Sequence, residues 1–449
     1  MKKLYQGETA KAIANFQISG QPVNLMLINA VATVKKAAAL ANFQTERFDK
    51  KIYNAIKFAA DQIIQGKYPE QFVTDQVQGG AGTSTNMNVN EVISSLAVEY
   101  LKGKVIIHPN DHVNLGQSTN DVIPTAIKVM LLRQIDELIS AMKLLEKEFQ
   151  RKSIAYKDIV KVGRTHLQDA VPITLGQSFG AYATFMKRNI QRFEENKKYL
   201  YQTNLGGTAL GSAINSSQSY LKFANAELAK LTGYPFKPAP DLFDATQNSD
   251  DFLHIANILK TFTAGLSKIC NDLRMLASGP RAGLGELILP EVQKGSSIMP
   301  GKVNPVILEL MNQICYQVFG NVETAFHAAL NSQFELNAML PIYAKNMNEA
   351  FILMTNGLKT LTEKAIKGLK PNEKKIQELF DNSLCTATAL NRYLGYDQTA
   401  KLVKNAVKNQ TQLIDELKKE KLLDEAALKK ILQAKALTEP SDEFLSHRN

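Results

Sequence analysis

The sequence of 449 residues lacks the features that mark membrane, secreted and disordered proteins. No apolar run approaches the roughly 18 residues of a membrane span, and the N-terminus MKKLYQGETAKAIANF has no uninterrupted apolar stretch to act as a signal peptide. Hydrophobic residues make up 45% and charged residues 21% of the chain, which excludes disordered and collagen-like chains. We therefore expect a cytoplasmic globular protein with no membrane partner.

Cysteines and basic clusters are also scarce. Cys270, Cys315 and Cys385 lie in apolar helical contexts without a CxxC pair, so we expect reduced core thiols. Lys and Arg exceed Asp and Glu by 53 to 43, yet the lysines are scattered and no basic stripe is interleaved with aromatic residues. We expect no nucleic-acid partner and interpret the excess charge as a solvated surface that also attracts small anions.

Metal-binding and nucleotide-binding motifs are missing as well. The six histidines are dispersed without an HExxH pattern, and His108 and His112 flank Pro109 and so do not share a helix face. The sequence has no GxSxG elbow, no Walker loop and no GxGxxG loop after a strand. We expect no metal site, no serine hydrolase chemistry and no nucleotide chemistry.

The dominant pattern is long amphipathic helices. Apolar residues recur at spacings of three and four between Leu131 and Phe149, and similar stripes run from Ile255 to Leu276 and from Ile307 to Val318. The segments 171–200 and 342–367 have the same character, whereas convincing period-2 strands are missing and the best short candidate is 104–107. The pattern predicts an all-α fold with a long central helical bundle.

Breaks between the helical segments predict three domains. At about 150 residues per domain, the length is compatible with three domains or with one large elongated one. We place boundaries near Asp121, before the first long helix, and near Pro371. The predicted units are an N-terminal helical domain (1–121), a central bundle domain (122–371) and a small C-terminal helical domain (372–449).

Polar, turn-rich segments separate the helices. The longest, 278–305, has Gly or Pro at nine of its 28 positions, which is typical of an active-site lid or a binding loop. This segment and those at 78–91, 110–124, 163–177 and 205–217 are rich in neutral hydrogen-bond donors, and Lys302 and His166 lie among these donors. A set of that kind suits a small polyanion. Its members are Thr83, Ser84, Asn86, Ser118, Thr119, Asn120, Thr165, His166, Ser296, Ser297, Lys302 and Asn304.

Structural roles compete with binding roles at two of these places. Ser118 to Asp121 could simply cap the helix after Pro124, and His166 could be a hydrogen-bonded core histidine. Lys302 lies between PG and VNP and cannot occupy a helix face, so an anion-binding role is at least as well supported as a solvated one.

Residues 295–305, GSSIMPGKVNP, resemble the signature loop of the fumarase and aspartase superfamily of lyases. The segments GAGTSTNMNVNEV, NDHVNLGQSTND, GRTHLQDAVPITLGQ, KICNDLRMLASGPRAGLGE and QFELN are also similar to family segments, in family order. The resemblance implies a homotetramer with a core of about twenty long helices and active sites built from loops of three subunits. It also implies a cofactor-free anti elimination that converts a small dicarboxylate substrate to fumarate.

The resemblance further implies a role for each motif residue. Ser296 resembles the general base, helped by Lys302, and Glu335 resembles the carboxylate that orients His166. Lys302 and Asn304 would hold one substrate carboxylate. The other carboxylate and its aci form would be held by hydroxyl groups, those of Thr83, Ser118, Thr119 and Ser297. The leaving group would be faced by Asn120, Thr165 and His166.

Two branches of the superfamily are compatible with the motifs. GTS at 82–84 and STND at 118–121 resemble the aspartase branch, which releases ammonia from L-aspartate; DATQNSD at 244–250 and NDLR at 271–274 also resemble it. NFQISG, LGGTALG and TALNRYLGYD lean toward class II fumarases, which interconvert L-malate and fumarate, and this branch is the alternative. Lys11 stands where members commonly have Arg. A catalytically silent member is disfavoured because the implied base, lysine, asparagine and histidine are all intact.

Overall fold

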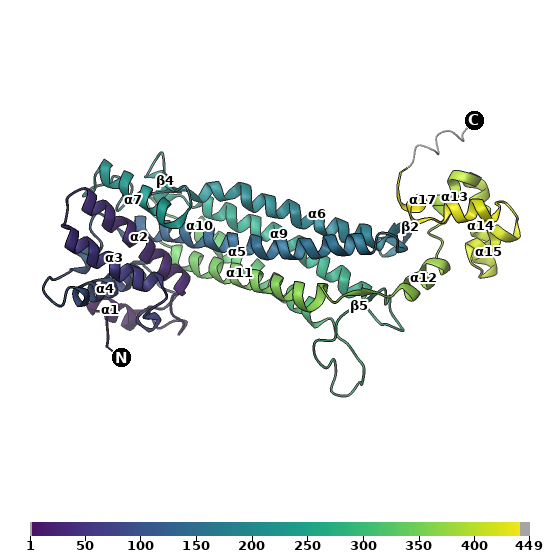
Figure 1. The fold of residues 1–449 in the computed structure, drawn as a ribbon, viewed down its shortest axis with the longest axis horizontal. Helices are drawn as coiled ribbons and strands as arrows, with labels where there is room; N and C mark the ends of the chain where they lie inside the picture. Colours follow the sequence, from purple (N-terminus) through teal and green to yellow (C-terminus); the bar gives the residue numbers. More distant parts are fainter. Residues whose placement is uncertain (1, 441–449) are drawn as a thin grey trace. The chain divides into compact units, whose positions relative to one another are not determined.

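The computed structural model describes residues 2–440, and helices dominate it (Figure 1). Its five longest helices are α5 (Thr119–Ala155), α6 (Leu175–Asn196), α9 (Asp250–Leu276), α10 (Val306–Leu330) and α11 (Leu340–Leu361). The predicted all-α class is confirmed, and the stripes predicted around Leu131 and Ile255 lie in α5 and α9.

The chain divides into two compact units. The first contains residues up to 140, 191–264 and 314–355, and the second contains 141–190, 265–313 and the residues from 356 on. Each of the five long helices contributes residues to both units. The three domains expected from the sequence remain a prediction.

The first unit is built around α2 (Leu25–Gln44), which is apolar on most of its circumference and largely buried. It packs against α3 (Lys50–Ile64) and α7 (Gln218–Thr232), while α4 (Thr83–Tyr100) packs against α3 and α1 (Gly7–Asn15). Short elements complete this unit: η1 (Pro69–Gln71), η2 (Pro109–Val113), η3 (Lys197–Leu200), β3 (Gln202–Thr203), β4 (Lys237–Pro238) and α8 (Asp244–Gln247).

The second unit has the longest strands of the described chain. β1 (Val160–Thr165) and β2 (Gln168–Thr174) form an antiparallel hairpin, and β5 (Leu287–Ile288) pairs with β6 (Lys370–Pro371). The remaining elements are η4 (Thr362–Ile366), α12 (Glu373–Asn382), α13 (Ala387–Leu394), α14 (Tyr396–Asn409), α15 (Leu413–Lys419), α16 (Glu425–Ile431) and α17 (Ala434–Thr438). Leu390, Leu402 and Leu417 belong to a buried cluster that joins several of these helices.

One local expectation is wrong. The helix expected from 171 begins at Leu175, because residues 168–174 pair with β1. The best strand candidate in the sequence, 104–107, forms no strand, in agreement with the absence of convincing strand patterns there. The hairpin requires Gly163, since a Cβ there would lie 2.4 Å from the carbonyl oxygen of Val171.

Cys270, Cys315 and Cys385 are buried and form no disulfide, as expected for core thiols. In the described part of the chain, no helix combines the length and the apolar character needed to cross a membrane.

Asp75 fixes the turn between α1 and α2. Its carboxylate accepts the backbone N–H groups of Ile18, Ser19, Gly20 and Val77 and the hydroxyl of Ser19, at 2.7 to 3.1 Å. Desolvation opposes ionisation, but these hydrogen bonds outweigh it and lower the pKa of Asp75 to about 2. Because the folded pKa lies below the unfolded value of about 4, this stabilisation is complete above pH 4 and is lost as the pH falls toward 2.

We expect Asp75→Asn to lower the free energy of unfolding by about 2 kcal/mol at pH 7, with the difference from wild type shrinking between pH 4 and pH 2. Urea unfolding at a series of pH values measures it. Asp158→Asn, at an exposed aspartate, is the control and should match wild type. A difference between Asp75→Asn and wild type that is independent of pH would contradict this account.

Candidate active site

Thr83 begins α4 at an exposed end of the first unit. The three preceding residues, Gly80, Ala81 and Gly82, have φ of 84°, 57° and 95°, so the chain enters the helix through a left-handed turn. A Cβ on Gly82 would lie 3.0 Å from the side chain of Ile123 in α5. Glycine therefore lets the starts of α4 and α5 approach each other. The Thr83 hydroxyl donates to the carbonyl oxygen of Gly80 at 2.8 Å.

Ser118 caps the N-terminus of α5. Its Oγ accepts the backbone N–H of Asn120 at 3.2 Å, and its own N–H donates to Asp121 Oδ1 at 2.9 Å. The capping role considered from the sequence is therefore present, although the helix begins at Thr119 rather than after Pro124. The Thr119 hydroxyl, almost completely buried, accepts from the amide of Asn86 in α4 at 3.3 Å.

The loop 204–211 holds Asn120 in place. Pro124 has no N–H to bond the carbonyl oxygen of Asn120, which accepts from Asn204 Nδ2 at 2.9 Å instead. Asn120 Nδ2 donates to the carbonyl oxygen of Ala209 at 2.7 Å. Asp121 Oδ2 accepts the backbone N–H groups of two further loop residues, Gly206 and Thr208. Thr119 and Asn120 are thus fixed by contacts that sequence reasoning had not identified.

Ser296, Ser297, Lys302 and Asn304 share one closed loop in the second unit. Asn304 Nδ2 donates to the carbonyl oxygen of Gly295 at 2.7 Å, which closes the loop at its base. The Ser296 hydroxyl accepts the N–H groups of two following residues, Ile298 at 3.2 Å and Met299 at 3.1 Å. The loop projects from the helices below β5 in Figure 1.

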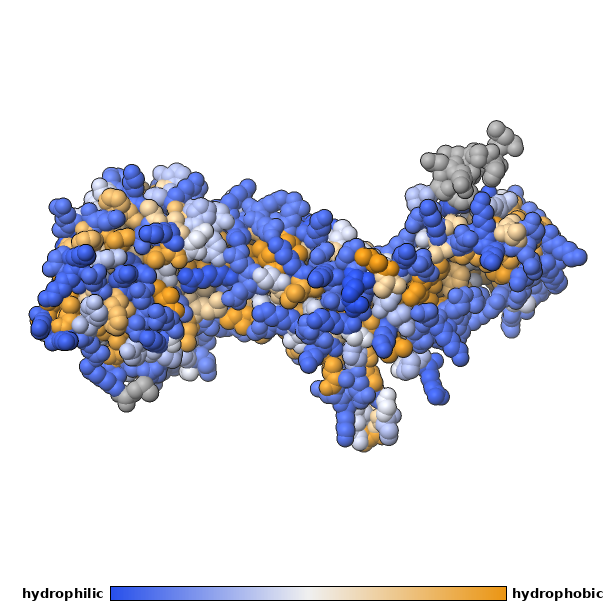
Figure 2. All heavy atoms as spheres, viewed as in Figure 1, coloured by the Kyte–Doolittle hydropathy of each residue, from blue (hydrophilic) through white to orange (hydrophobic). Residues whose placement is uncertain are grey.

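Most of this loop is open to solvent. Ser297 and Lys302 are exposed, and apolar side chains, those of Ile298, Met299 and Val303, are exposed beside them. Figure 2 shows apolar atoms among polar ones on the projecting loop. Exposed apolar groups at the tip of a loop are typical of a segment that packs against another surface in the functional state of the protein.

Thr165 and His166 lie at the exposed tip of the β1–β2 hairpin. His166 and Leu167 form its two-residue turn, with φ of 53° and 61°. The core-histidine interpretation of His166 is therefore wrong, because the turn presents the ring to solvent. Glu335 is exposed in the turn between α10 and α11 of the first unit, and its role toward His166 stays a prediction.

Glu286 joins the hairpin to the base of the 278–305 segment. Its side chain is 1% exposed and binds Arg164 Nη1 at 2.6 Å and Lys161 Nζ at 2.9 Å. Burial lowers the pKa of Lys161, while the Glu286 charge opposes that shift. The backbone carbonyl of Glu286 accepts from the N–H of Asn372 at 2.9 Å. Glu286 thereby fixes three segments, and only its place in the GLGE motif marked it in the sequence.

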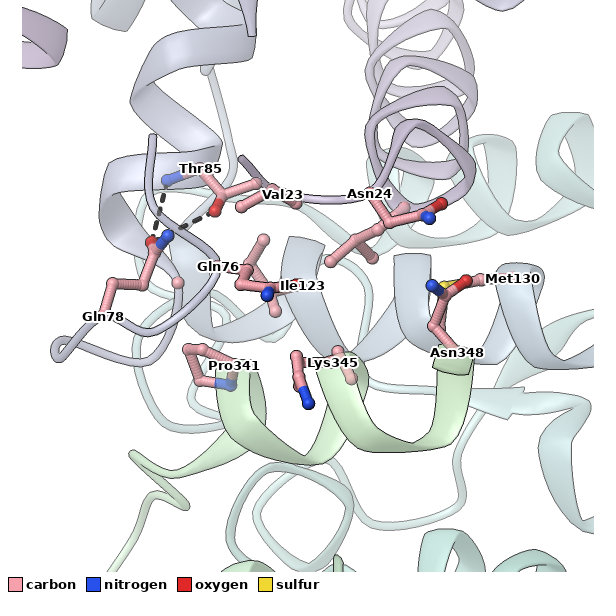
Figure 3. A pocket seen from close by; sticks show the side chains of 13 residues that line it. Val23, Asn24, Gln76, Gln78, Thr85, Ile123, Met130, Pro341, Lys345 and Asn348 are labelled. Carbon is pink, nitrogen blue, oxygen red and sulfur yellow. Dashed lines mark hydrogen bonds between the residues drawn. The ribbon is translucent and has the colours of Figure 1, made fainter. Parts of the chain in front are cut away.

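Residues at the start of α4, Gly82 and Thr85, line a small cavity (Figure 3). Gln78 Oε1 accepts from the backbone N–H and the hydroxyl of Thr85, at 3.2 and 3.1 Å, on one side of it. Lys345 and Asn348 of α11 line the other side. The residues predicted from the motifs do not line this cavity, and they lie on helix ends and loop tips instead. Among the described residues, no cluster of His, Cys, Asp and Glu is arranged to hold a metal ion.

Two family models and many relatives match the chain. The model described as "Lyase" matches residues 1–320, and that described as "Fumarase C C-terminus" matches 387–439. The chain is 44% identical to the aspartate ammonia-lyase of a Bacillus species, over 98% of this chain and 95% of that protein. It is 42% identical to the aspartate ammonia-lyase of Helicobacter pylori (strain ATCC 700392 / 26695), over 100% of this chain and 97% of that protein.

Solved structures give similar matches. The recombinant class II fumarase of Schistosoma mansoni superposes with a TM-score of 0.91 at 33% identity, over 97% of this chain and 95% of that one. The fumarate lyase:delta crystallin of Brucella melitensis bound to cobalt superposes with a TM-score of 0.90 at 42% identity, over 97% of this chain and 94% of that one.

We expect Glu286→Gln to lower the free energy of unfolding by about 3 kcal/mol, because it leaves the buried ammonium of Lys161 without its carboxylate. Glu291→Gln removes an exposed carboxylate from the same segment and is the matched control. Denaturant unfolding of both variants measures the difference. Equal stability of the two variants would show that Glu286 does not anchor the hairpin.

Proposed function

Because the chain belongs to the fumarase/aspartase superfamily of lyases, we propose that it is an aspartate ammonia-lyase, which eliminates ammonia from L-aspartate to give fumarate. The superfamily predicted from the motifs is confirmed. Relatives named aspartate ammonia-lyase, which match almost the full length at 42% and 44% identity, support this branch. The class II fumarase among the structural relatives keeps hydration of fumarate as the alternative.

The orientation of Asn120 is compatible with an ammonium leaving group. The carbonyl oxygen of Ala209 can only accept, so the group that faces it at 2.7 Å must be Asn120 Nδ2. Asn120 Oδ1 is then left to accept a hydrogen bond from a ligand. An ammonium group has N–H donors and no acceptor, so it matches this oxygen, and a hydroxyl or water can also donate to it. The orientation of Asn120 therefore fits ammonia without excluding water, and the full-length relatives named aspartate ammonia-lyase carry the choice between the two branches.

Thr83 supports the same choice. Its hydroxyl proton is donated to Gly80, so its lone pairs face outward as acceptors. In this arrangement Thr83 suits an ammonium group better than the carboxylate that the family resemblance assigned to it.

Ser118 and Thr119 have the opposite polarity. Each hydroxyl oxygen accepts an N–H, from the backbone of Asn120 and from the amide of Asn86, so each O–H proton is free to donate outward. Removing a proton next to a carboxylate creates a second negative charge on that carboxylate. Neutral donors fixed in advance stabilise such a charge at little reorganisation cost. We assign one substrate carboxylate and its aci form to these two hydroxyls, with Ser297.

Ser296 is the proposed base. Two backbone N–H groups already donate to its Oγ, and hydrogen bonds of that kind stabilise an oxyanion and lower the pKa of the hydroxyl. Lys302 and Asn304 share this loop and would hold the other carboxylate. Thr165 and His166 would face the leaving group, with Glu335 orienting the histidine.

We also propose a cytoplasmic homotetramer whose sites combine loops of different copies. The exposed 295–304 loop cannot exclude water alone, and a desolvated site strengthens every polar contact. α10 and the turn after it present exposed aromatic and aliphatic side chains: Tyr316 at 58%, Phe326 at 38%, Leu330 at 63% and Phe334 at 88%. Four large apolar side chains exposed on one helix and the turn after it favour association with further copies of the chain.

We expect the purified protein to release fumarate from L-aspartate, and little or none from L-malate, as followed by ultraviolet absorbance. Ser296→Ala should lower kcat by about 10³-fold with the fold and assembly retained, because the loop contributes little to the core. Preferential turnover of L-malate would favour the fumarase alternative. A Ser296→Ala variant with most of the wild-type kcat would show that Ser296 is not the base.

The composite site predicts complementation between two inactive variants. Ser296→Ala and Thr165→Val, denatured together and refolded as mixed tetramers, should regain about a quarter of the wild-type activity if the two residues of each site come from different copies. Variants refolded separately and then mixed are the control and should stay inactive. Verified mixed tetramers without activity would show that one copy supplies both residues.

A further inference from the structure

A buried polar network lies beneath Ser118, Thr119 and Asn120 in the first unit. Lys35 of α2 has no solvent exposure, and its Nζ donates to Asn114 Oδ1 at 2.6 Å. The same oxygen accepts from the amides of Asn86 at 3.2 Å and Asn90 at 3.3 Å in α4. Since Asn86 also donates to the hydroxyl of Thr119, one chain of contacts runs from Lys35 to a substrate-binding side chain.

Asp121 forms the other half of the network. It has no solvent exposure, and its two carboxylate oxygens serve different segments. Oδ1 accepts the N–H of Ser118, while Oδ2 accepts those of Gly206 and Thr208. Gly206 and Thr208 belong to the loop 204–211, which also contains Ala209, the acceptor that orients Asn120. One carboxylate therefore sets the spacing between the N-terminus of α5 and the loop that fixes Asn120.

We propose that Lys35 and Asp121 are a pair of positioning residues for the dicarboxylate site. Neither is assigned a contact with substrate. Asp121 holds the backbone of Ser118 and the 206–208 segment, and Lys35 holds Asn114 and, through Asn86, the hydroxyl of Thr119. The inference rests on the proposed function for the identity of the ligand that the positioned groups bind.

The cost of this pair argues for positioning rather than packing. Burial raises the pKa of Asp121 to about 7, although three backbone N–H groups and Lys35 oppose the shift, and burial lowers the pKa of Lys35 to about 7 against the attraction of Asp121. From α7, Tyr220 also faces this carboxylate, and burial raises its pKa well above the usual value. Apolar residues of similar volume are often at least as stabilising as a buried charge pair. What apolar residues cannot supply is the set of directed hydrogen bonds.

Three variants test the proposal: Asp121→Asn, Lys35→Met and the double variant. An amide at position 121 has one accepting oxygen, so it must release either Ser118 or the 206–208 segment. Lys152→Met is the matched control, because Lys152 is also buried and donates to the carbonyl oxygen of Leu369 in the second unit. The readouts are assembly by light scattering, thermal unfolding, succinate binding by calorimetry, and KM and kcat for L-aspartate.

We expect each single variant to weaken succinate binding by roughly tenfold or more and to raise KM accordingly. Lys152→Met should lose thermal stability with succinate affinity within about twofold of wild type. The double variant carries no unpaired buried charge, so it should regain thermal stability while succinate binding stays weak. This separation of stability from affinity is what a purely structural role does not predict.

Wild-type succinate affinity in the assembled double variant would overturn the inference, as would an Asp121→Asn tetramer that binds succinate like wild type. Wild type that binds no succinate would overturn it too. If wild type releases no fumarate from L-aspartate yet binds succinate in a manner that depends on Asp121, the proposed function fails and the positioning role stands.

Discussion

The carboxylate of Asp121 is the constraint on which the first half of the candidate site depends. It accepts backbone N–H groups from Ser118, three positions earlier, and from Gly206 and Thr208, which lie 85 and 87 positions later in the sequence. It therefore sets the spacing between these two segments. Asp121 thereby supports Ser118 directly and Asn120 through the loop that contains Ala209. Local contacts with Gly80 and Asn86 orient the hydroxyl groups of Thr83 and Thr119. In the proposed function, the donors of this set bind a carboxylate and the acceptors face the ammonium group.

In the second unit, an exposed loop is attached to a base that is fixed by ion pairs and hydrogen bonds. Glu286 is bound by two cationic side chains and by the 370–372 segment, whereas the 295–304 loop is closed by Asn304 and otherwise open to solvent. Rigid attachment combined with an exposed tip suits a segment that must close over a ligand. Within the loop, two backbone N–H groups hold the Ser296 hydroxyl in its turn.

Much of the fold could be predicted from the sequence. The stripe from Leu131 to Phe149 defines α5 because an amphipathic helix needs apolar residues at spacings of three and four. The hairpin at 160–174 was missed because Gly163 and Pro172 interrupt its strands and hide a period-2 pattern. His166 could not be placed either, because positive φ at His and Leu has no signal like that of Asn-Gly.

The candidate site was predicted in its motif residues but not in its support. Asp121, Lys35 and Glu286 act through hydrogen bonds between segments far apart in the chain, and no local periodicity encodes such contacts. Pro124 is a related case, since its missing N–H becomes informative only once Asn204 is seen to bond the carbonyl oxygen of Asn120. Sequence reasoning reaches the groups that carry chemistry more easily than those that hold them.

A crystal structure of the assembled protein with succinate tests the central claim most directly. The account predicts one carboxylate on the hydroxyls of Ser118 and Thr119, and the other on Lys302 and Asn304 of a different copy. Succinate bound away from Ser118 and Thr119, or held by residues of a single copy alone, would contradict it.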